Sequence, residues 1–82
     1  MTYSINTAEM HALLSWLRSA REAQGLSMRD LANRLGKPHS YVQKVEQGER
    51  RLDVVEYVWY CNSLNVKPET GLEQIKNRKK NI

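Results

Sequence analysis

The segment from Gly36 to Gly48 is the feature that most limits how this chain can fold. It has the sequence GKPHSYVQKVEQG, with Pro38 near its start and a glycine at each end. Proline is tolerated in the first turn of a helix, and glycine is favoured just after a helix ends, so the segment predicts a helix over residues 38–47. Valine supplies its only aliphatic side chains. Because so narrow an apolar face cannot stabilise a helix alone, we expect other elements to hold it in place.

Helical spacing of apolar residues also precedes this segment. One helix is predicted from the positions Met10, Leu13, Leu14, Leu17, Ala20 and Gln24, and a shorter one from Leu31, Ala32 and Leu35. Asn6 or Thr7 can cap the first helix, and Gly25 suits its end. Ser27 and Asp30 have the spacing of a capping box at the start of the second.

Two more helices are predicted after Gly48. Asp53 can cap the first, whose expected inward positions are Val54, Tyr57, Val58, Cys61 and Leu64. Asn65 suits the left-handed position at its end, and Pro68 begins a short last helix with Leu72 and Ile75. Since no segment alternates with the two-residue period of a strand, the fold is predicted to be all-α with five helices.

Length and composition agree with one small intracellular domain. The 82 residues allow a single domain, which we place at residues 7–75, between a flexible N-terminal lead (1–6) and a basic flexible tail (76–82). The single cysteine, Cys61, excludes an intramolecular disulfide and fits a reducing compartment. No apolar run is long enough to span a membrane and no signal peptide precedes the domain, so a cytoplasmic protein is expected.

The charge distribution is more informative than the formal net charge of +4. Residues 76–80, KNRKK, contribute much of the excess of basic residues. Within residues 27–51 the basic residues Arg29, Arg34, Lys37, Lys44, Arg50 and Arg51 outnumber the acidic residues Asp30, Glu46 and Glu49. This local excess favours a polyanionic partner at that part of the fold.

The two short helices between residues 27 and 47 are joined by a turn that contains glycine, which is the helix-turn-helix arrangement. Ala32 is small enough to let the two helices cross closely. On the second helix, Tyr41, Val42 and Val45 share one arc. The opposite arc carries only side chains that form hydrogen bonds, namely His39, Ser40, Gln43, Lys44 and Gln47.

Three stretches, LRSAREAQGLSMRDLANRLG, SYVQKVEQGER and LNVKPE, resemble the lambda-repressor-like, or Xre/Cro, helix-turn-helix regulators. The resemblance covers roughly residues 13–75. It implies a five-helix lambda-repressor-like DNA-binding domain without a cofactor. It further implies a transcription regulator, on family grounds a repressor, that acts as a homodimer on a palindromic double-stranded operator.

The resemblance also assigns roles to individual residues. The helix over 38–47 matches the recognition helix, so the residues expected to read base edges are His39, Ser40, Gln43 and Lys44. The residues expected to contact phosphates are Arg29, Lys37, Tyr41, Gln47, Arg50 and Arg51. A solvated His39 and a pure phosphate contact by Lys44 are the alternatives to base recognition. Arg21 and Glu46 match a structural ion pair between the first helix and the end of the third.

The chain departs from the family pattern in several places. Met28 stands where a glutamine commonly contacts phosphate, and Pro38 replaces the usual Ser or Thr cap of the recognition helix. Trp59 falls on the outward side of its helix, and an exposed tryptophan on a small domain favours a contact surface. The predicted dimer interface is therefore Trp59, Tyr60, Leu72 and Ile75. In the alternative, Trp59 folds over the first helix and covers Met10 or Tyr3.

Two other functions remain compatible with the sequence. One is an antitoxin or restriction-modification controller with the same DNA-binding domain. An antitoxin would bind its toxin through the N-terminal extension and the basic tail. The other is a protein-interaction module that has lost DNA binding. An enzyme is not expected, because His11, His39 and Cys61 have no metal-ligand spacing and no nucleophile or phosphate-loop motif appears. Cys61 is instead expected to be a small core residue.

Overall fold

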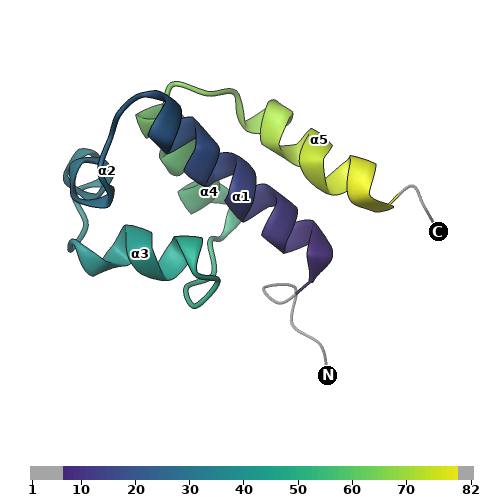
Figure 1. Cartoon of the computed structure of the whole chain (residues 1–82), viewed down its shortest axis with the longest axis horizontal. Helices are drawn as coiled ribbons and strands as arrows, with labels where there is room; N and C mark the ends of the chain where they lie inside the picture. The colour runs from purple at the N-terminus through teal and green to yellow at the C-terminus, as the bar shows by residue number, and fades with distance from the viewer. Residues whose placement is uncertain (1–6, 80–82) are drawn as a thin grey trace.

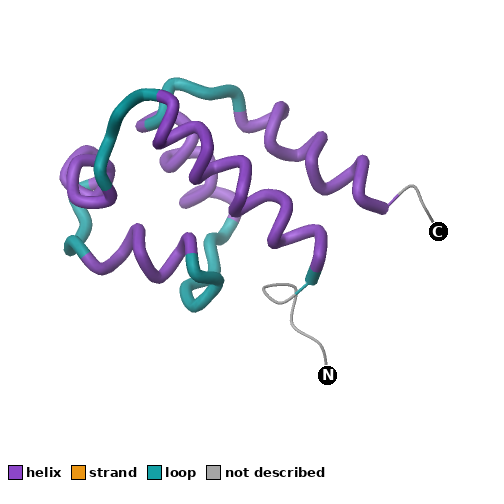
Figure 2. Tube along the Cα trace, in the orientation of Figure 1, coloured by secondary structure: helices purple, strands orange, loops and turns teal. Residues whose placement is uncertain are grey.

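The structure, a computed structural model, describes residues 7–79, and side chains within residues 7–76. It contains α1 (Ala8–Ala23), α2 (Met28–Leu35), α3 (Ser40–Glu46), α4 (Val54–Ser63) and α5 (Pro68–Lys79). No strand occurs between residues 7 and 79 (Figure 2), so the predicted all-α fold with five helices is confirmed. The expected N-terminal lead lies outside the described residues. The last helix continues to Lys79, past the domain boundary that we placed at residue 75.

The helices surround one core, with α1 as the longest element at its centre (Figure 1). The last helix, α5, runs alongside α1, while α2 and α3 lie at the other side of the molecule and α4 lies behind α1. Every helix except α5 supplies fully or nearly fully buried hydrophobic side chains: Leu13, Leu14, Leu17, Leu31, Ala32, Tyr41, Val42, Val45, Tyr57, Tyr60, Cys61 and Leu64.

Side-chain caps begin three of the helices, as the sequence predicts. The Met10 N–H donates to Thr7 Oγ1 at 3.2 Å at the start of α1. Ser27 and Asp30 form the expected capping box, in which each side chain accepts the other residue's N–H at 3.0 Å. Hydrogen bonds to its carboxylate from Ser27, first from the backbone N–H and then from the side chain, lower the pKa of Asp30. Asp53 caps α4 in the same way.

Four of the helices end in residues with left-handed backbone, which are Gly25, Gly36, Gly48 and Asn65. The conformation matters most at Gly36, whose φ is 68°. There the Lys37 N–H donates back to the Ala32 carbonyl at 3.0 Å, which closes α2 and turns the chain toward α3. A side chain with a Cβ adopts this φ only with strain, so glycine is the residue that suits the turn.

The start of α3 differs from the prediction. The helix begins at Ser40, whereas the sequence placed Pro38 in its first turn. Pro38 instead begins the turn that leads into the helix, in which its carbonyl accepts the Tyr41 N–H at 3.0 Å. His39 stands at the N-cap with helical backbone but donates and accepts no capping side-chain bond. The proline ring therefore shapes the entry to α3 without belonging to it.

The inward face of α4 also differs from the prediction. Val54 and Val58 were expected to be buried, but they are 79% and 36% exposed, while Tyr60 is 1% exposed. Apolar residues occur on both sides of this helix, with the valines on the exposed side, so apolar spacing alone does not identify its buried face. The inward arc is set by the larger side chains of Tyr57, Tyr60 and Leu64.

A close approach between α1 and α5 fixes the position of the last helix. Gly71 is buried, and a Cβ there would overlap Tyr57 Oη and lie 2.6 Å from Trp16 Cζ3. The Tyr57 hydroxyl also donates to the Pro68 carbonyl at 2.7 Å. Glycine in the middle of α5 therefore lets this helix pack directly on Trp16 and Tyr57.

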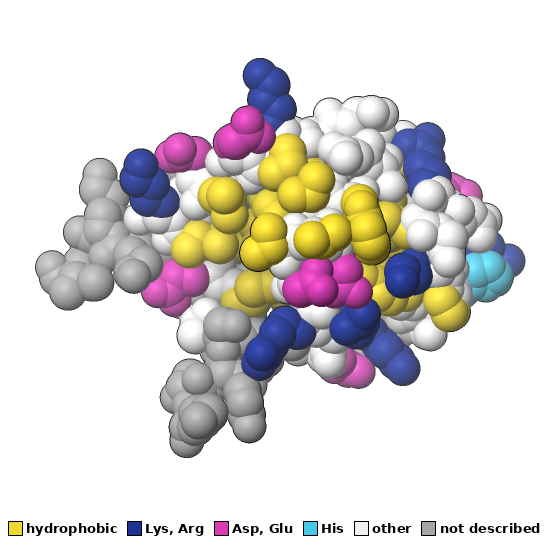
Figure 3. All heavy atoms as spheres, turned by 180° about the vertical axis from the view of Figure 1, so that it is seen from behind, with side chains coloured by type: hydrophobic (Ala, Val, Ile, Leu, Met, Phe, Trp, Pro, Cys, Tyr) yellow, Lys and Arg dark blue, Asp and Glu magenta, His cyan; other side chains and the backbone are white. Residues whose placement is uncertain are grey.

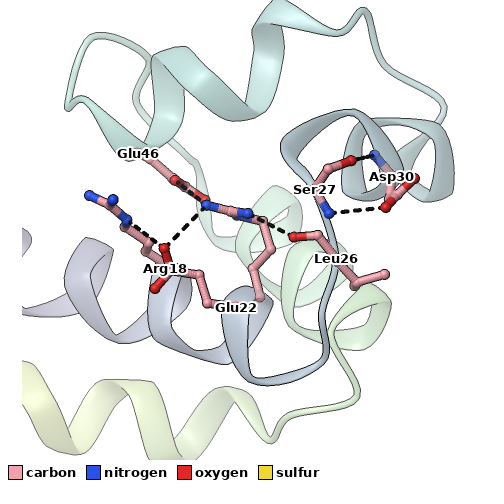
Figure 4. Close-up of polar contacts among 7 residues, drawn as sticks. Arg18, Glu22, Leu26, Ser27, Asp30 and Glu46 are labelled. Carbon is pink, nitrogen blue, oxygen red and sulfur yellow. Dashed lines mark hydrogen bonds and ion pairs between the residues drawn. The ribbon is translucent and has the colours of Figure 1, made fainter.

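A buried ion pair connects α1 to the end of α3 (Figure 4). Arg21 Nε donates to Glu46 Oε2 at 2.7 Å, Nη2 donates to Oε1 at 3.2 Å, and Nη1 donates to the Leu26 carbonyl at 2.7 Å. The side chains of Arg21 and Glu46 are only 8% and 4% exposed. The hydrogen bond with Glu46 raises the pKa of Arg21. The expected contact is thus present, and it joins α3 to both α1 and the loop before α2.

Glu46→Gln should lower the free energy of unfolding by about 3 kcal/mol, because it leaves the buried Arg21 guanidinium without its counter-charge. Urea denaturation followed by circular dichroism measures this loss. The control is Glu22→Gln, which removes the exposed pair at 3.2 Å with Arg18 and the longer contact at 3.9 Å with Arg21 but leaves Glu46 in place. It should cost less than about 1 kcal/mol. Equal losses for the two variants would contradict a special role for the buried pair.

Candidate nucleic-acid interface

The helix-turn-helix consists of α2, the turn at residues 36–39, and α3. Three residues of α3 hold it on the bundle, because Tyr41 is 9% exposed and Val42 and Val45 are fully buried. Ala32 of α2 is also fully buried. It adds no more than a methyl group where the two helices meet, so they can cross closely.

The opposite side of α3 is exposed and polar. We call this the outward face, and it consists of His39, Ser40, Gln43, Lys44 and Gln47, all of which are exposed. The structure therefore brings together the expected base-contacting residues on one side of the helix. Their groups match base edges: an ammonium donates to guanine, an amide pairs with adenine, and a hydroxyl both donates and accepts.

Two cationic groups lie over the ring of Tyr41, beside the outward face. Lys37 Nζ and Arg50 Cζ are each 5.4 Å from the centre of this ring. Burial raises the pKa of Tyr41. Tyr41 was predicted to contact phosphate, but as a core residue it presents little surface to a ligand. Its ring instead supports Lys37 and Arg50 by cation–π contact.

Arg50 is held by further contacts. Its Nη2 donates to Glu56 Oε2 at 2.7 Å, and its Nη1 donates to the Arg51 carbonyl at 3.1 Å. Glu56 was not expected from the sequence to be a partner of Arg50. The sequence does contain a signal for this contact, because Asp53 and Glu56 have capping-box spacing. This spacing places the Glu56 carboxylate at the start of α4, next to the loop that carries Arg50.

The remaining residues expected near phosphate come from the start of α2, the end of α3 and the loop after α3. Arg29 and Arg51 are exposed, and so is Gln47 at the end of α3. Arg34, which carries part of the local basic excess, donates from Nη1 to the Ser63 carbonyl at 3.1 Å. Met28 packs against the core, so its side chain supports the first turn of α2 rather than extending toward a ligand.

The residues predicted for a dimer interface differ in exposure. Trp59 and Leu72 are 55% and 52% exposed, and Ile75 is partly buried against the core. Tyr60 is 1% exposed, so its place in the predicted interface was wrong. Trp59 lines a recess with Leu35 and Tyr41, and no residue of α1 lines this recess. Tyr3, which the alternative had Trp59 cover together with Met10, lies outside the described residues.

An apolar patch lies on the exposed side of α4. It consists of Val54, Val55, Val58 and Trp59, all of them exposed. Seen from behind, hydrophobic side chains gather across the middle of the molecule with charged side chains around them (Figure 3). Sequence spacing missed two of these residues because it assigned Val54 and Val58 to the core.

The described residues offer little support for other kinds of site. No group of three or more His, Cys, Asp and Glu side chains among them is placed to hold a metal ion. Cys61 is fully buried in the core, and burial raises the pKa of its thiol. None of the helices described is long and apolar enough to cross a membrane.

Comparison with known proteins identifies the family. The family model for helix-turn-helix proteins matches residues 17–70. Among solved structures, the chain is 40% identical to an XRE-family like protein from Pseudomonas syringae pv. tomato str. DC3000, with a TM-score of 0.81 and 88% of each chain covered. No curated protein sequence gives a significant match.

Two further structures are similar over most of the chain. The restriction-modification controller protein C.AhdI from Aeromonas hydrophila is 32% identical, with a TM-score of 0.72 over 79% of this chain and 98% of that one. The clp gene regulator ClgR from C. glutamicum is 22% identical, with a TM-score of 0.76 over 90% of this chain and 96% of that one, and shows the fold alone. Together with the family match over most of the helices, these similarities establish that the chain belongs to the Xre-like helix-turn-helix family.

Proposed function

We propose that the protein is a transcription regulator that binds double-stranded DNA in a sequence-specific manner, with α3 in the major groove. The observation that carries this proposal is the outward face of α3. A short helix exposes five hydrogen-bonding side chains on one side while three other residues anchor it to the core. A helix held in this way has the dimensions and donor groups that the major groove accepts.

The proposal divides the surface into two parts. The outward face supplies base contacts through Ser40, Gln43 and Lys44, with His39 at the start of α3. The flanking cations, including Lys37 and Arg50, hold the DNA backbone and set the register of the helix. Phosphate contacts give affinity for every sequence, whereas contacts to base edges give preference among sequences.

Homodimerisation is part of the same proposal, because two copies related by a two-fold axis would recognise two half-sites of a palindrome. The apolar patch on α4 supports a second copy as its partner. Between Val54 and Trp59 the only charged residue is Glu56. Its carboxylate already pairs with Arg50. Two copies that meet here would bury these apolar side chains against each other.

The mode of regulation we propose is repression, which follows from the family resemblance. A restriction-modification controller is a specific second candidate, because the similarity to C.AhdI extends over nearly the whole of that protein at 32% identity. Such a controller would use the same outward face and the same dimer, so the two candidates differ in the genes regulated and not in the chemistry of binding.

Selection from a pool of random duplexes with the purified protein tests the proposal. We expect enrichment of a two-fold symmetric motif whose half-sites lie about one helical turn apart. The absence of any enriched motif at low salt would contradict DNA recognition and favour a protein-interaction module.

Lys44→Ala should reduce the preference at one position of each half-site in the same selection, by about 1–3 kcal/mol, because the lost side chain contacts a base. Arg50→Ala is the comparison. It should weaken binding to all sequences alike and reduce the slope of log affinity against log salt by about one. An unchanged sequence preference in Lys44→Ala would refute its assignment to a base.

Trp59→Ala should shift the protein toward monomer in sedimentation velocity experiments, since it removes the largest exposed side chain of the apolar patch. Leu72→Ala serves as the control, because Leu72 is similarly exposed but lies on α5. A dimer that dissociates only in the Leu72 variant would place the interface on α5.

A further inference from the structure

Arg50 is held more firmly than a surface arginine usually is. Its guanidinium lies over the Tyr41 ring, donates to Glu56 at 2.7 Å and donates to the Arg51 carbonyl at 3.1 Å. Even so, 44% of the Arg50 side chain is exposed. Arginine has five N–H donors, so these contacts fix its plane and leave donors for a further ligand.

Glu56 is a rigid partner for this arginine. Its side chain is 16% exposed. Its Oε1 accepts the Asp53 N–H at 3.0 Å, and its own N–H donates to Asp53 Oδ1 at 2.8 Å. Both carboxylate oxygens are thus used, one to cap α4 and one to hold Arg50. The orientation of Arg50 therefore depends on the first turn of α4.

An acidic side chain beside a DNA-binding surface repels phosphates, so by charge alone Glu56 weakens binding. The contacts of Glu56 with Arg50 are expected to strengthen DNA binding instead. An arginine that is already oriented loses less side-chain entropy when it binds phosphate, and the planar guanidinium suits bidentate contact with phosphate oxygens. The two effects predict opposite signs for the loss of the Glu56 charge.

We propose that Glu56 is a positioning residue that orients Arg50 toward a DNA phosphate, so that neutralising Glu56 weakens DNA binding. Lys37 lies over the same Tyr41 ring, so one aromatic side chain supports two cations. The inference rests on the proposed DNA-binding function and adds to it a residue that touches no DNA.

The test compares Glu56→Gln with Glu49→Gln in titrations of a labelled duplex at low salt. Glutamine at residue 56 keeps an oxygen for the Asp53 N–H, so the cap of α4 persists, but its amide N–H₂ then faces the Arg50 guanidinium. Glu49 is exposed in the loop that carries Arg50, and Glu49→Gln removes the same charge as Glu56→Gln. We expect about threefold weaker binding for Glu56→Gln and about threefold tighter binding for Glu49→Gln.

The same pair of changes in an Arg50→Ala background separates positioning from a general structural effect. If Glu56 acts through Arg50, Glu56→Gln should then tighten binding as Glu49→Gln does. Thermal melting by circular dichroism checks that each variant is folded. Should Glu56→Gln not fold, Glu56→Asp replaces it, because a shorter carboxylate keeps the charge but draws back from Arg50 and should also weaken binding.

The outcomes are distinguishable. The positioning role would be overturned if Glu56→Gln bound DNA more tightly than the wild-type protein. It would also be overturned if Glu56→Gln weakened binding equally with and without Arg50. Either result would leave the proposed DNA-binding function intact. If the wild-type protein binds no duplex at low salt, the proposed function itself fails.

Discussion

The contact between Arg21 and Glu46 is the interaction on which the position of α3 depends. The Arg21 guanidinium uses two N–H groups for the Glu46 carboxylate and a third for the Leu26 carbonyl. In this way one buried side chain links α1, the loop before α2 and the last turn of α3. Charges so far from water are stable only with their partners, so the geometry of the three segments is coupled.

This coupling explains how a helix with so little apolar surface keeps its place. Val42 and Val45 fill the core side of α3, Tyr41 packs at its edge, and Glu46 ties its end to α1. None of these four residues belongs to the outward face. The side chains of the outward face can therefore vary in type without loss of packing.

Much of this architecture could be predicted from the sequence because it depends on local rules. Caps at Thr7 and Ser27 and left-handed ends at Gly25 and Gly36 follow from spacing and residue type, and they are where we expected them. The predictions were wrong where tertiary packing decides which residues are buried. Spacing could not show which arc of α4 faces the core, so Val58 was placed inside and Tyr60 outside.

The candidate interface shows the same division between local rules and packing. The outward face follows from helical periodicity, but the support of Arg50 by Tyr41 and Glu56 joins residues of α3, a loop and α4. Such a contact depends on how the helices are packed. For the same reason, family resemblance suggested Tyr41 as a phosphate contact, whereas its burial makes it a support for the neighbouring cations.

We propose above all that α3 enters the DNA major groove by its outward face. Mapping of backbone amide NMR shifts on addition of a short duplex tests this claim most directly. The account predicts the largest shifts at Ser40, Gln43, Lys44 and Gln47, with smaller ones around Lys37 and Arg50 and little change along α5. Shifts concentrated on α5 or on the apolar patch of α4, with α3 unaffected, would contradict it.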